Sequence, residues 1–213
     1  MKILFQGDSI TDAGASAAQK KGSSLGSGYP KYAAEYLREM FSDKELDFIN
    51  LGISGNQTKD IVERIQTDII DVKPDLTSIL VGINDVWHHF GDKQWIPNDV
   101  FEERYRIILE AIKSTGSHIV MMEPYFIPVD DDEERFRVDL PNKVSVIRKL
   151  AREYAEVYIP LDGYIAAECV RREPKELSED GVHPSPAGAR FIGRIYAVAV
   201  APIIEKHFAN GGK

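Results

Sequence analysis

Cysteine is almost absent from this sequence, long apolar runs are missing, and we expect no leader segment. The single cysteine, Cys169, cannot form an internal disulfide, and such usage is typical of a reducing compartment. No stretch approaches about 20 apolar residues, so we expect no membrane-spanning helix. Met1 and Lys2 are followed by only three apolar residues, too few for a secretory signal. These absences favour a cytoplasmic protein.

Positive charge is also scarce, since 26 lysines and arginines stand against 34 aspartates and glutamates, a formal net charge of −8 at pH 7. A chain with this balance is not expected to bind nucleic acid or an anionic membrane surface, and it suits a neutral small-molecule substrate. The acidic run at 130–134 could suggest a divalent-cation site. Acidic side chains also suit the first turn of a helix, and we expect a solvated helix start there.

What the sequence does contain is an alternation of short β-rich runs and longer helical patterns. Its 213 residues, 43% of them hydrophobic, are enough for one domain over 1–213. The alternation predicts an α/β fold with a parallel sheet of about five strands and helices on both faces. The expected strands are 2–6, 46–51, 76–81, 118–122 and 157–160. The expected helices are 29–41, one opening at Thr58, 100–115, 134–156 with Pro141 kinking or dividing it, 164–171 and 186–207. Residues 13–28, rich in Gly, Ser and Ala, are expected to form a mobile loop at the rim of an active site.

A serine follows the first expected strand, at the edge where open α/β sheets bind ligands. Taken alone, Gly7-Asp8-Ser9 fits a strand followed by a helix cap, because Asp and Ser are favoured caps. Three further segments change that interpretation, namely Gly-Ile-Ser-Gly-Asn at 52–56, Gly-Ile-Asn-Asp at 82–85 and Asp-Gly-Val-His-Pro at 180–184. We expect these loops to converge on one edge of the sheet.

Acyl transfer needs a nucleophile, a base, a group that orients the base and donors for the developing oxyanion. Ser9 is the candidate nucleophile and His183 the candidate base. Asp180, three residues before the histidine, is the candidate that orients its ring. The amides of Ser9 and Gly55, with the side-chain amide of Asn84, are the candidate oxyanion donors.

Together these segments resemble the four sequence blocks of the SGNH (GDSL-type) esterase family, whose name lists its Ser, Gly, Asn and His. The blocks here are 7–9, 50–55, 82–85 and 180–184, and they carry Ser9, Gly55, Asn84 and His183 in the family's order. The first block continues with Ile10 where the family has leucine, a small apolar exchange. The resemblance implies a flavodoxin-like three-layer α/β/α sandwich. It also implies a serine esterase that works through a Ser-His-Asp triad and an acyl-enzyme, with no cofactor or metal.

A narrower similarity links the chain to the cytoplasmic bacterial acetylxylan esterases within that family. It is carried by Gly82 to Trp87, by Gly26 to Tyr29 and by Met122 to Ile127. The similarity implies a small acylated carbohydrate as substrate, with acetyl groups removed from xylose units of short oligosaccharides. It further implies assembly as a homo-oligomer.

Several side chains near the candidate machinery are possible substrate contacts. Trp87 and Tyr125 follow strand ends and could stack on a sugar ring, as could Trp95 and Phe126. Asp8 could contact substrate or compete with Asp180 as the orienting carboxylate. Neighbours along a chain usually point to different sides, so a structural role near the loops is favoured for Asp8. His88-His89 has no carboxylate or cysteine at ligand spacing, and we interpret it as part of a pocket rim rather than a metal site.

Other functions remain open at the sequence level. A thioesterase or lysophospholipase would use the same catalytic residues but needs an apolar groove for a long acyl chain. A flavodoxin-like module could bind a phosphate ligand in the Gly-rich loops, although none of them has the Gly-x-x-x-x-Gly-Lys pattern. A catalytically dead carbohydrate binder would have no need for the full set of catalytic candidates.

Overall fold

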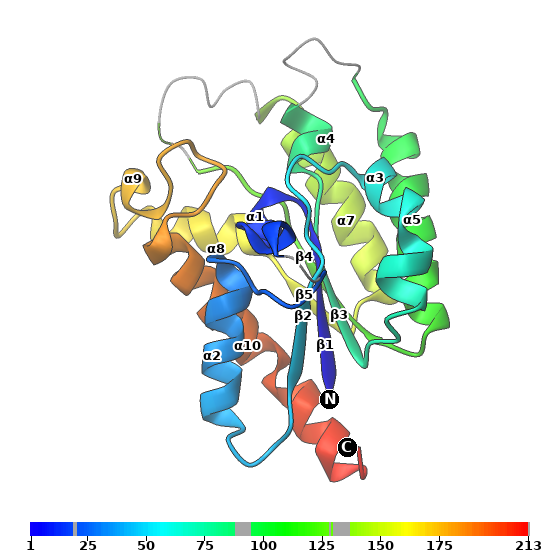
Figure 1. Ribbon diagram of the computed structural model, residues 1–213. Coiled ribbons are helices and arrows are strands. Elements are labelled where there is room, and N and C mark those ends of the chain that lie inside the picture. The colour runs from blue at the N-terminus through cyan, green and yellow to red at the C-terminus, as the bar shows by residue number, and fades with distance from the viewer. Residues whose placement is uncertain (19–20, 88–94, 128, 130–136, 213) are drawn as a thin grey trace.

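A five-stranded parallel sheet forms the centre of the molecule (Figure 1). The computed structural model describes residues 1–18, 21–87, 95–127, 129 and 137–212. The strands are β1 (Lys2–Gly7), β2 (Asp47–Asn50), β3 (Leu76–Leu80), β4 (His118–Met122) and β5 (Val157–Ile159), and their order across the sheet is β2-β1-β3-β4-β5. β1 and β3 are buried along most of their length, as expected for inner strands of a parallel sheet that helices cover on both faces.

Helices cover both faces of the sheet and give it three layers (Figure 1). One layer holds α2 (Tyr29–Met40), α8 (Leu161–Glu168) and α10 (Pro186–Ala209), and the other holds α3 (Thr58–Glu63), α5 (Asn98–Ser114) and α7 (Leu140–Tyr154). Each layer has its own apolar core, with Phe5 and Tyr196 packed on one face of β1 and Leu4 and Ile61 on the other. The three-layer α/β/α fold predicted from the sequence is confirmed.

Short elements connect the sheet to these layers: α1 (Ser9–Asp12), η1 (Ala15–Ala17), the π-helix η2 (Gln66–Ile70), α4 (Ile83–Trp87) and α9 (Pro174–Leu177). α1 and α4 both lie at the carboxyl end of the sheet (Figure 1). The strand order reverses between β1 and β3, where the register pairs Gly7 with Leu80. This reversal is the position at which open α/β sheets bind ligands.

Several described points of the loop at 13–28 contact neighbouring segments, and its mobility stays a prediction. The Ser27 amide donates to the Ala13 carbonyl over 2.9 Å, and Asn50 Nδ2 donates to the Leu25 carbonyl over 3.1 Å. Lys21 forms an ion pair with the buried carboxylate of Asp68 in η2. These contacts hold the loop against the exit of β2.

Helix α7 has Pro141 in its first turn. Arg137 is also helical and is separated from α7 by a turn at 138–139, so the predicted helix is interrupted just before Pro141, in agreement with the alternative that Pro141 divides it. The acidic run at 130–134 lies outside the described residues, so its interpretation stays a prediction.

Among the described residues, helix α10 is long and apolar enough to cross a membrane by length and composition alone. However, 56% of its 18-residue apolar window is buried inside the fold, as in the core helix of a globular protein. The helix packs along α2 and places Ile192, Tyr196 and Val200 in the core. Its apolar character is therefore used to cover the sheet.

Candidate active site

Ser9 lies directly beyond the carboxyl end of β1, as the first residue of α1. Asp8 caps this short helix, since its Oδ1 accepts a hydrogen bond from the Ile10 amide over 3.0 Å. The Ser9 hydroxyl is partly exposed and lies 2.9 Å from Nε2 of His183, which is 174 positions away in the sequence. The structure thus brings the predicted nucleophile and the predicted base into hydrogen-bond contact.

His183 is held by a tight loop between α9 and α10, closed by an isolated bridge between Ser178 and Pro184. Its Nδ1 lies 2.6 Å from Asp180 Oδ2. The other carboxylate oxygen of Asp180 accepts bonds from the backbone amides of Val182 and His183, over 2.9 and 2.7 Å. Asp180 therefore fixes both the loop and the ring orientation of the histidine.

The environment of Asp180 keeps it ionised. Partial burial opposes the charge, but hydrogen bonds from the His183 ring and from the backbone amides of His183 and Val182 outweigh it and lower the pKa of the carboxyl below its ordinary value. The side chains of Asp180 and His183 are about half exposed, at 47% and 50%. An anionic partner on Nδ1 is what an imidazole needs to accept a proton at Nε2.

Gly55 lies in a turn formed by Ile53, Ser54, Gly55 and Asn56, which we call the glycine turn. The Asn56 amide donates to the Ile53 carbonyl over 3.2 Å and closes the turn. Gly55 has a φ of 81°, in the left-handed region that favours glycine. Among the described residues, the amides of Ser9 and Gly55 donate to no acceptor, so both are available to an oxyanion.

Asn84 lies in α4, next to the exit of β3, and its side chain is held in place. Nδ2 donates to the Asn56 carbonyl over 3.0 Å, which leaves one N–H of the amide for a ligand. Gln57 Nε2 donates to the Asn84 carbonyl over 3.1 Å. The carboxylate of Asp85 accepts bonds from the amide and the hydroxyl of Thr58 at the start of α3, and so joins α3 to α4.

Sequence reasoning missed the side chains that join these loops together. Gln57 and Thr58 connect the glycine turn to α4, and Asn50 Nδ2 donates to the Thr11 carbonyl over 2.7 Å. Asn50 lies within, and Thr11 beside, the family's sequence blocks, and this position is the only signal in the sequence that could have marked them as functional. The sequence does not indicate which residues they bond to.

Three of the predicted substrate contacts, Tyr125, Asp8 and Phe126, are buried and therefore wrong. Tyr125 is 0% exposed and packs in the core cluster that includes Tyr29 and Tyr196, so its ring cannot stack on a sugar. Asp8 is 1% exposed because its carboxyl turns inward to cap α1. Asp8 therefore has the structural role that the sequence favoured.

The predictions for Trp87, His88 and His89 are not tested by the described residues. Trp87 closes α4, but its side chain lies outside the described part of the chain, as do His88 and His89. Phe126 is 2% exposed, so its ring cannot stack on a sugar, whereas Trp95 is 52% exposed. Among the described residues, no three His, Cys, Asp or Glu side chains group as ligands for a metal ion.

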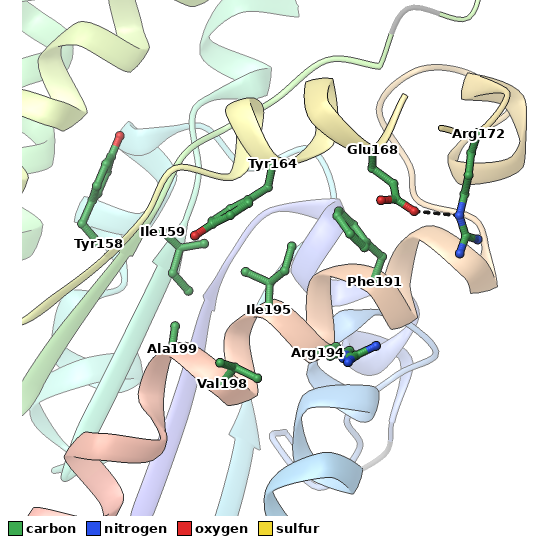
Figure 2. Close-up of a pocket in the computed structure, with 10 residues that line it drawn as sticks. All are labelled: Tyr158, Ile159, Tyr164, Glu168, Arg172, Phe191, Arg194, Ile195, Val198 and Ala199. Carbon is green, nitrogen blue, oxygen red and sulfur yellow. Dashed lines mark ion pairs between the residues drawn. The ribbon is translucent and has the colours of Figure 1, made fainter. Parts of the chain in front are cut away.

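A separate hollow of about 460 Å³ lies away from these residues, between β5, α8 and α10 (Figure 2). Tyr164, Phe191, Ile195 and Val198 give it an apolar lining, and an ion pair between Glu168 and Arg172 lies beside them. No member of the serine, histidine and aspartate set lines it. It is therefore not the place where an ester would meet Ser9.

The chain is similar in sequence to known hydrolases. The sequence model of the GDSL-like Lipase/Acylhydrolase family matches residues 5–191. An acetylxylan esterase from Geobacillus stearothermophilus is 31% identical over 201 residues, which cover 92% of this chain and 91% of that protein. The thioesterase 1/protease 1/lysophospholipase L1 of Escherichia coli K12 is 24% identical over 190 residues, with 86% and 83% covered.

Solved structures give the same result. A crystal structure of the Geobacillus stearothermophilus acetylxylan esterase superposes with a TM-score of 0.85 at 30% identity and covers 94% of each chain. Structures of catalytic mutants of that esterase, which also match, carry alanine in place of a serine, a histidine or an aspartate. In that protein the mutated aspartate and histidine are three positions apart.

Proposed function

This chain belongs to the GDSL-like lipase/acylhydrolase family and is a carboxylic ester hydrolase, and from that premise we propose that it removes acetyl groups from acylated xylo-oligosaccharides through a Ser9–His183–Asp180 triad. The observation that carries the proposal is the chain of contacts from Ser9 Oγ to His183 Nε2 (2.9 Å) and from His183 Nδ1 to Asp180 (2.6 Å). The spacing of Asp180 and His183 equals that of the aspartate and histidine mutated in the related acetylxylan esterase.

The first half of the reaction forms an acyl-enzyme. Ser9 Oγ attacks the ester carbonyl carbon while its proton moves to His183 Nε2, and Asp180 stabilises the imidazolium. The carbonyl oxygen becomes an oxyanion that accepts bonds from the amides of Ser9 and Gly55 and from Asn84 Nδ2. The intermediate collapses, the C–O bond to the alcohol breaks, and His183 returns its proton to the departing sugar oxygen.

The second half regenerates the enzyme. Water attacks the acetyl-Ser9 carbonyl and gives a proton to His183, and a second oxyanion uses the same donors. Collapse of that intermediate breaks the bond to Ser9 Oγ, which recovers its proton, and releases acetate. Every group needed for both halves belongs to this chain.

The substrate class rests on the related proteins and on charge. The relative with 31% identity is named as an acetylxylan esterase, and the net charge of −8 suits a neutral sugar. Trp87, beyond Asn84 on α4, is the aromatic residue that we propose to stack on the sugar.

We further propose that copies of the chain associate and that the protein works in the cytoplasm. Support for association comes from the outer face of α10 and α8, where Val198 is 63% and Tyr164 is 47% exposed (Figure 2). Light scattering after size exclusion should show an oligomer that Val198→Glu reduces in mass. A monomer for the wild-type protein would contradict the proposal.

The function is tested by acetate release from an acetylated xylo-oligosaccharide, measured beside hydrolysis of aryl acetate and aryl octanoate. The wild-type protein should cleave the sugar ester and prefer acetate to octanoate, whereas Ser9→Ala should cleave neither and keep its fold. Ser114→Ala is the matched control, because that serine is exposed at the end of α5 and its hydroxyl donates locally to the Ala111 carbonyl.

The outcomes separate the nucleophile from the substrate. Hydrolysis of aryl acetate without release of acetate from the sugar would overturn the assignment of a carbohydrate substrate. It would not contradict the assignment of Ser9 as the nucleophile. A preference for octanoate would favour the thioesterase or lysophospholipase alternative that the Escherichia coli relative represents. Ester hydrolysis by Ser9→Ala would overturn the triad.

A further inference from the structure

The orientation of the Gly55 amide depends on what holds the residue before it. In a four-residue turn, a positive φ at the third residue is the mark of type II, and Gly55 has a φ of 81°. Types I and II differ mainly in the direction of the central peptide, which here joins Ser54 to Gly55. A flip of that peptide would turn the Gly55 N–H away from an oxyanion. The catalytic turn type therefore needs an anchor at Ser54.

Asp12 supplies this anchor. Its Oδ2 accepts a bond from the Ser54 amide over 3.0 Å and another from the Ser54 hydroxyl over 2.7 Å. The first residue of the glycine turn is held separately, because the Ile53 amide donates to the Gly7 carbonyl over 3.2 Å. The last is held by the bond from Asn84 Nδ2 to the Asn56 carbonyl. Three of the four turn residues are thus pinned, and the amide left for a ligand is that of Gly55.

Asp12 is itself fixed in position. It is 2% exposed and ends α1, the helix that begins with Ser9. Its Oδ1 accepts a bond from the Ser16 amide over 2.8 Å, and its Oδ2 accepts one from the Ser16 hydroxyl over 2.9 Å. A Cβ on Gly52 would lie 2.5 Å from the Asp12 amide, so this glycine allows the close approach of the two segments. One carboxylate therefore joins the nucleophile's helix to the glycine turn.

The bonds that Asp12 accepts are stronger than neutral ones, because an ionised acceptor roughly doubles the strength of a hydrogen bond. Although burial opposes its charge, the bonds from Ser16 and Ser54 lower the pKa of the Asp12 carboxyl below its ordinary value. Asp12 therefore remains ionised, and an acceptor only, at neutral pH.

We propose that Asp12 is a positioning residue that sets the oxyanion hole by holding the Ser54–Gly55 peptide in its catalytic orientation. This rests on the proposed function, in which Ser9 attacks and the Gly55 amide receives the oxyanion. Asp12 touches neither the substrate nor the reacting atoms. It acts through Ser54.

The test compares an aryl acetate with the matching aryl thionoacetate, in which sulfur replaces the carbonyl oxygen. Sulfur is a weak hydrogen-bond acceptor, so the thionoester makes little use of the oxyanion donors. Asp12→Asn replaces one accepting oxygen with a donating NH₂ group that faces the N–H groups of Ser16 or Ser54. Its kcat on aryl acetate should fall by about a hundredfold, near the loss of one oxyanion donor, with little change in KM. Its rate on the thionoester should fall by less than about threefold.

Ser54→Ala is the second variant, and Ser27→Ala is the matched control. Ser54→Ala removes the hydroxyl bond to Asp12 and keeps the amide bond, so it should show the same selective loss on a smaller scale. Ser27 lies in the same loop as Ser16 but bonds to the Ala13 carbonyl, and its alanine variant should match the wild-type protein. If Asp12→Asn fails to fold, as judged by circular dichroism, Ser54→Ala decides the question.

Equal losses on the ester and the thionoester would overturn the positioning role, because a general structural defect affects both. A kcat on aryl acetate equal to the wild-type value in Asp12→Asn would also overturn the positioning role. The same result in Ser54→Ala would do so if Asp12→Asn does not fold. Failure of the proposed function has a different signature, since then the wild-type protein would not hydrolyse aryl acetate or Ser9→Ala would retain that activity.

Discussion

The buried carboxyl of Asp8 is expected to make the folded protein less stable as the pH rises. Asp8 is 1% exposed, its Oδ1 accepts one bond from the Ile10 amide, and its Oδ2 has no hydrogen-bond partner among the described residues. Burial, reinforced by the negative charge of Asp85, outweighs that bond and raises the pKa of Asp8 from 3.8 to about 7. The carboxyl is therefore held in its neutral form by the fold.

The sign and size of the effect follow from proton linkage. Between pH 3.8 and about 7 the unfolded chain has lost the Asp8 proton and the folded chain has kept it. The stabilisation from this proton is fully present below the lower value and is lost as the pH rises through the higher one. One pH unit corresponds to about 1.4 kcal/mol, so the loss is on the order of 4 kcal/mol. Burial also raises the pKa of Asp85 to about 6, which adds a smaller change of the same sign.

Urea unfolding between about pH 4 and about pH 8 measures this change. The free energy of unfolding of the wild-type protein should fall across the range. Asp8→Asn keeps an acceptor for the Ile10 amide and cannot ionise. Its free energy of unfolding should therefore fall less with pH than that of the wild-type protein, by the amount attributed to the Asp8 proton. Asp99→Asn is the control, because that aspartate is exposed and also accepts a local bond, from the Val100 amide. If Asp8→Asn and the wild-type protein show the same pH dependence, the reasoning from burial is wrong.

Three further substitutions test other parts of the structure. Asn84→Ala removes an oxyanion donor, so kcat on aryl acetate should fall by about a hundredfold to a thousandfold; a wild-type kcat would remove Asn84 from the mechanism. Gly55→Ala puts a side chain at a φ of 81°, where strain costs about 1–2 kcal/mol even though nothing lies within 4 Å of the new atom. Thermal melting should detect that loss, and an unchanged midpoint would argue against a left-handed Gly55. Lys143→Met deletes a fully buried ammonium that donates to the Ile96 carbonyl over 2.5 Å and lies 3.4 Å from the carboxylate of Asp139. Leaving that acid unpaired should lower the free energy of unfolding by about 3–5 kcal/mol, and a urea midpoint equal to that of the wild-type protein would contradict this.

The fold was predictable because the sequence patterns that indicate most of its strands and helices are local. Strand β4 (His118–Met122) was placed to the residue, since a short β-rich run between helical patterns allows few alternatives. Helix α4 (Ile83–Trp87) was not predicted. Five residues after a glycine carry too little periodicity to indicate a helix, and this one is fixed through Asp85 and Thr58 of another element.

The candidate site was predictable as a set of residues but not as a set of contacts. Ser9, His183 and Asp180 were identified by residue type and order, and the structure places them within hydrogen-bond distance. Tyr125 was misplaced because a strand end predicts only that an aromatic residue lies near the sheet edge. Whether its ring faces solvent or core depends on tertiary packing, here against the cluster that holds Tyr196. Asp12 was overlooked because its partners lie on two other segments.

The 174 positions between Ser9 and His183 have a consequence for how their contact reports on folding. The contact joins the exit of β1 to the loop between α9 and α10, so it exists only when both segments are packed on the same edge of the sheet. In the proposed mechanism, a fragment that lacks residues 174–209 would keep Ser9 but lose the imidazole that takes its proton. Ester hydrolysis is therefore expected to report molecules in which the two segments are folded together.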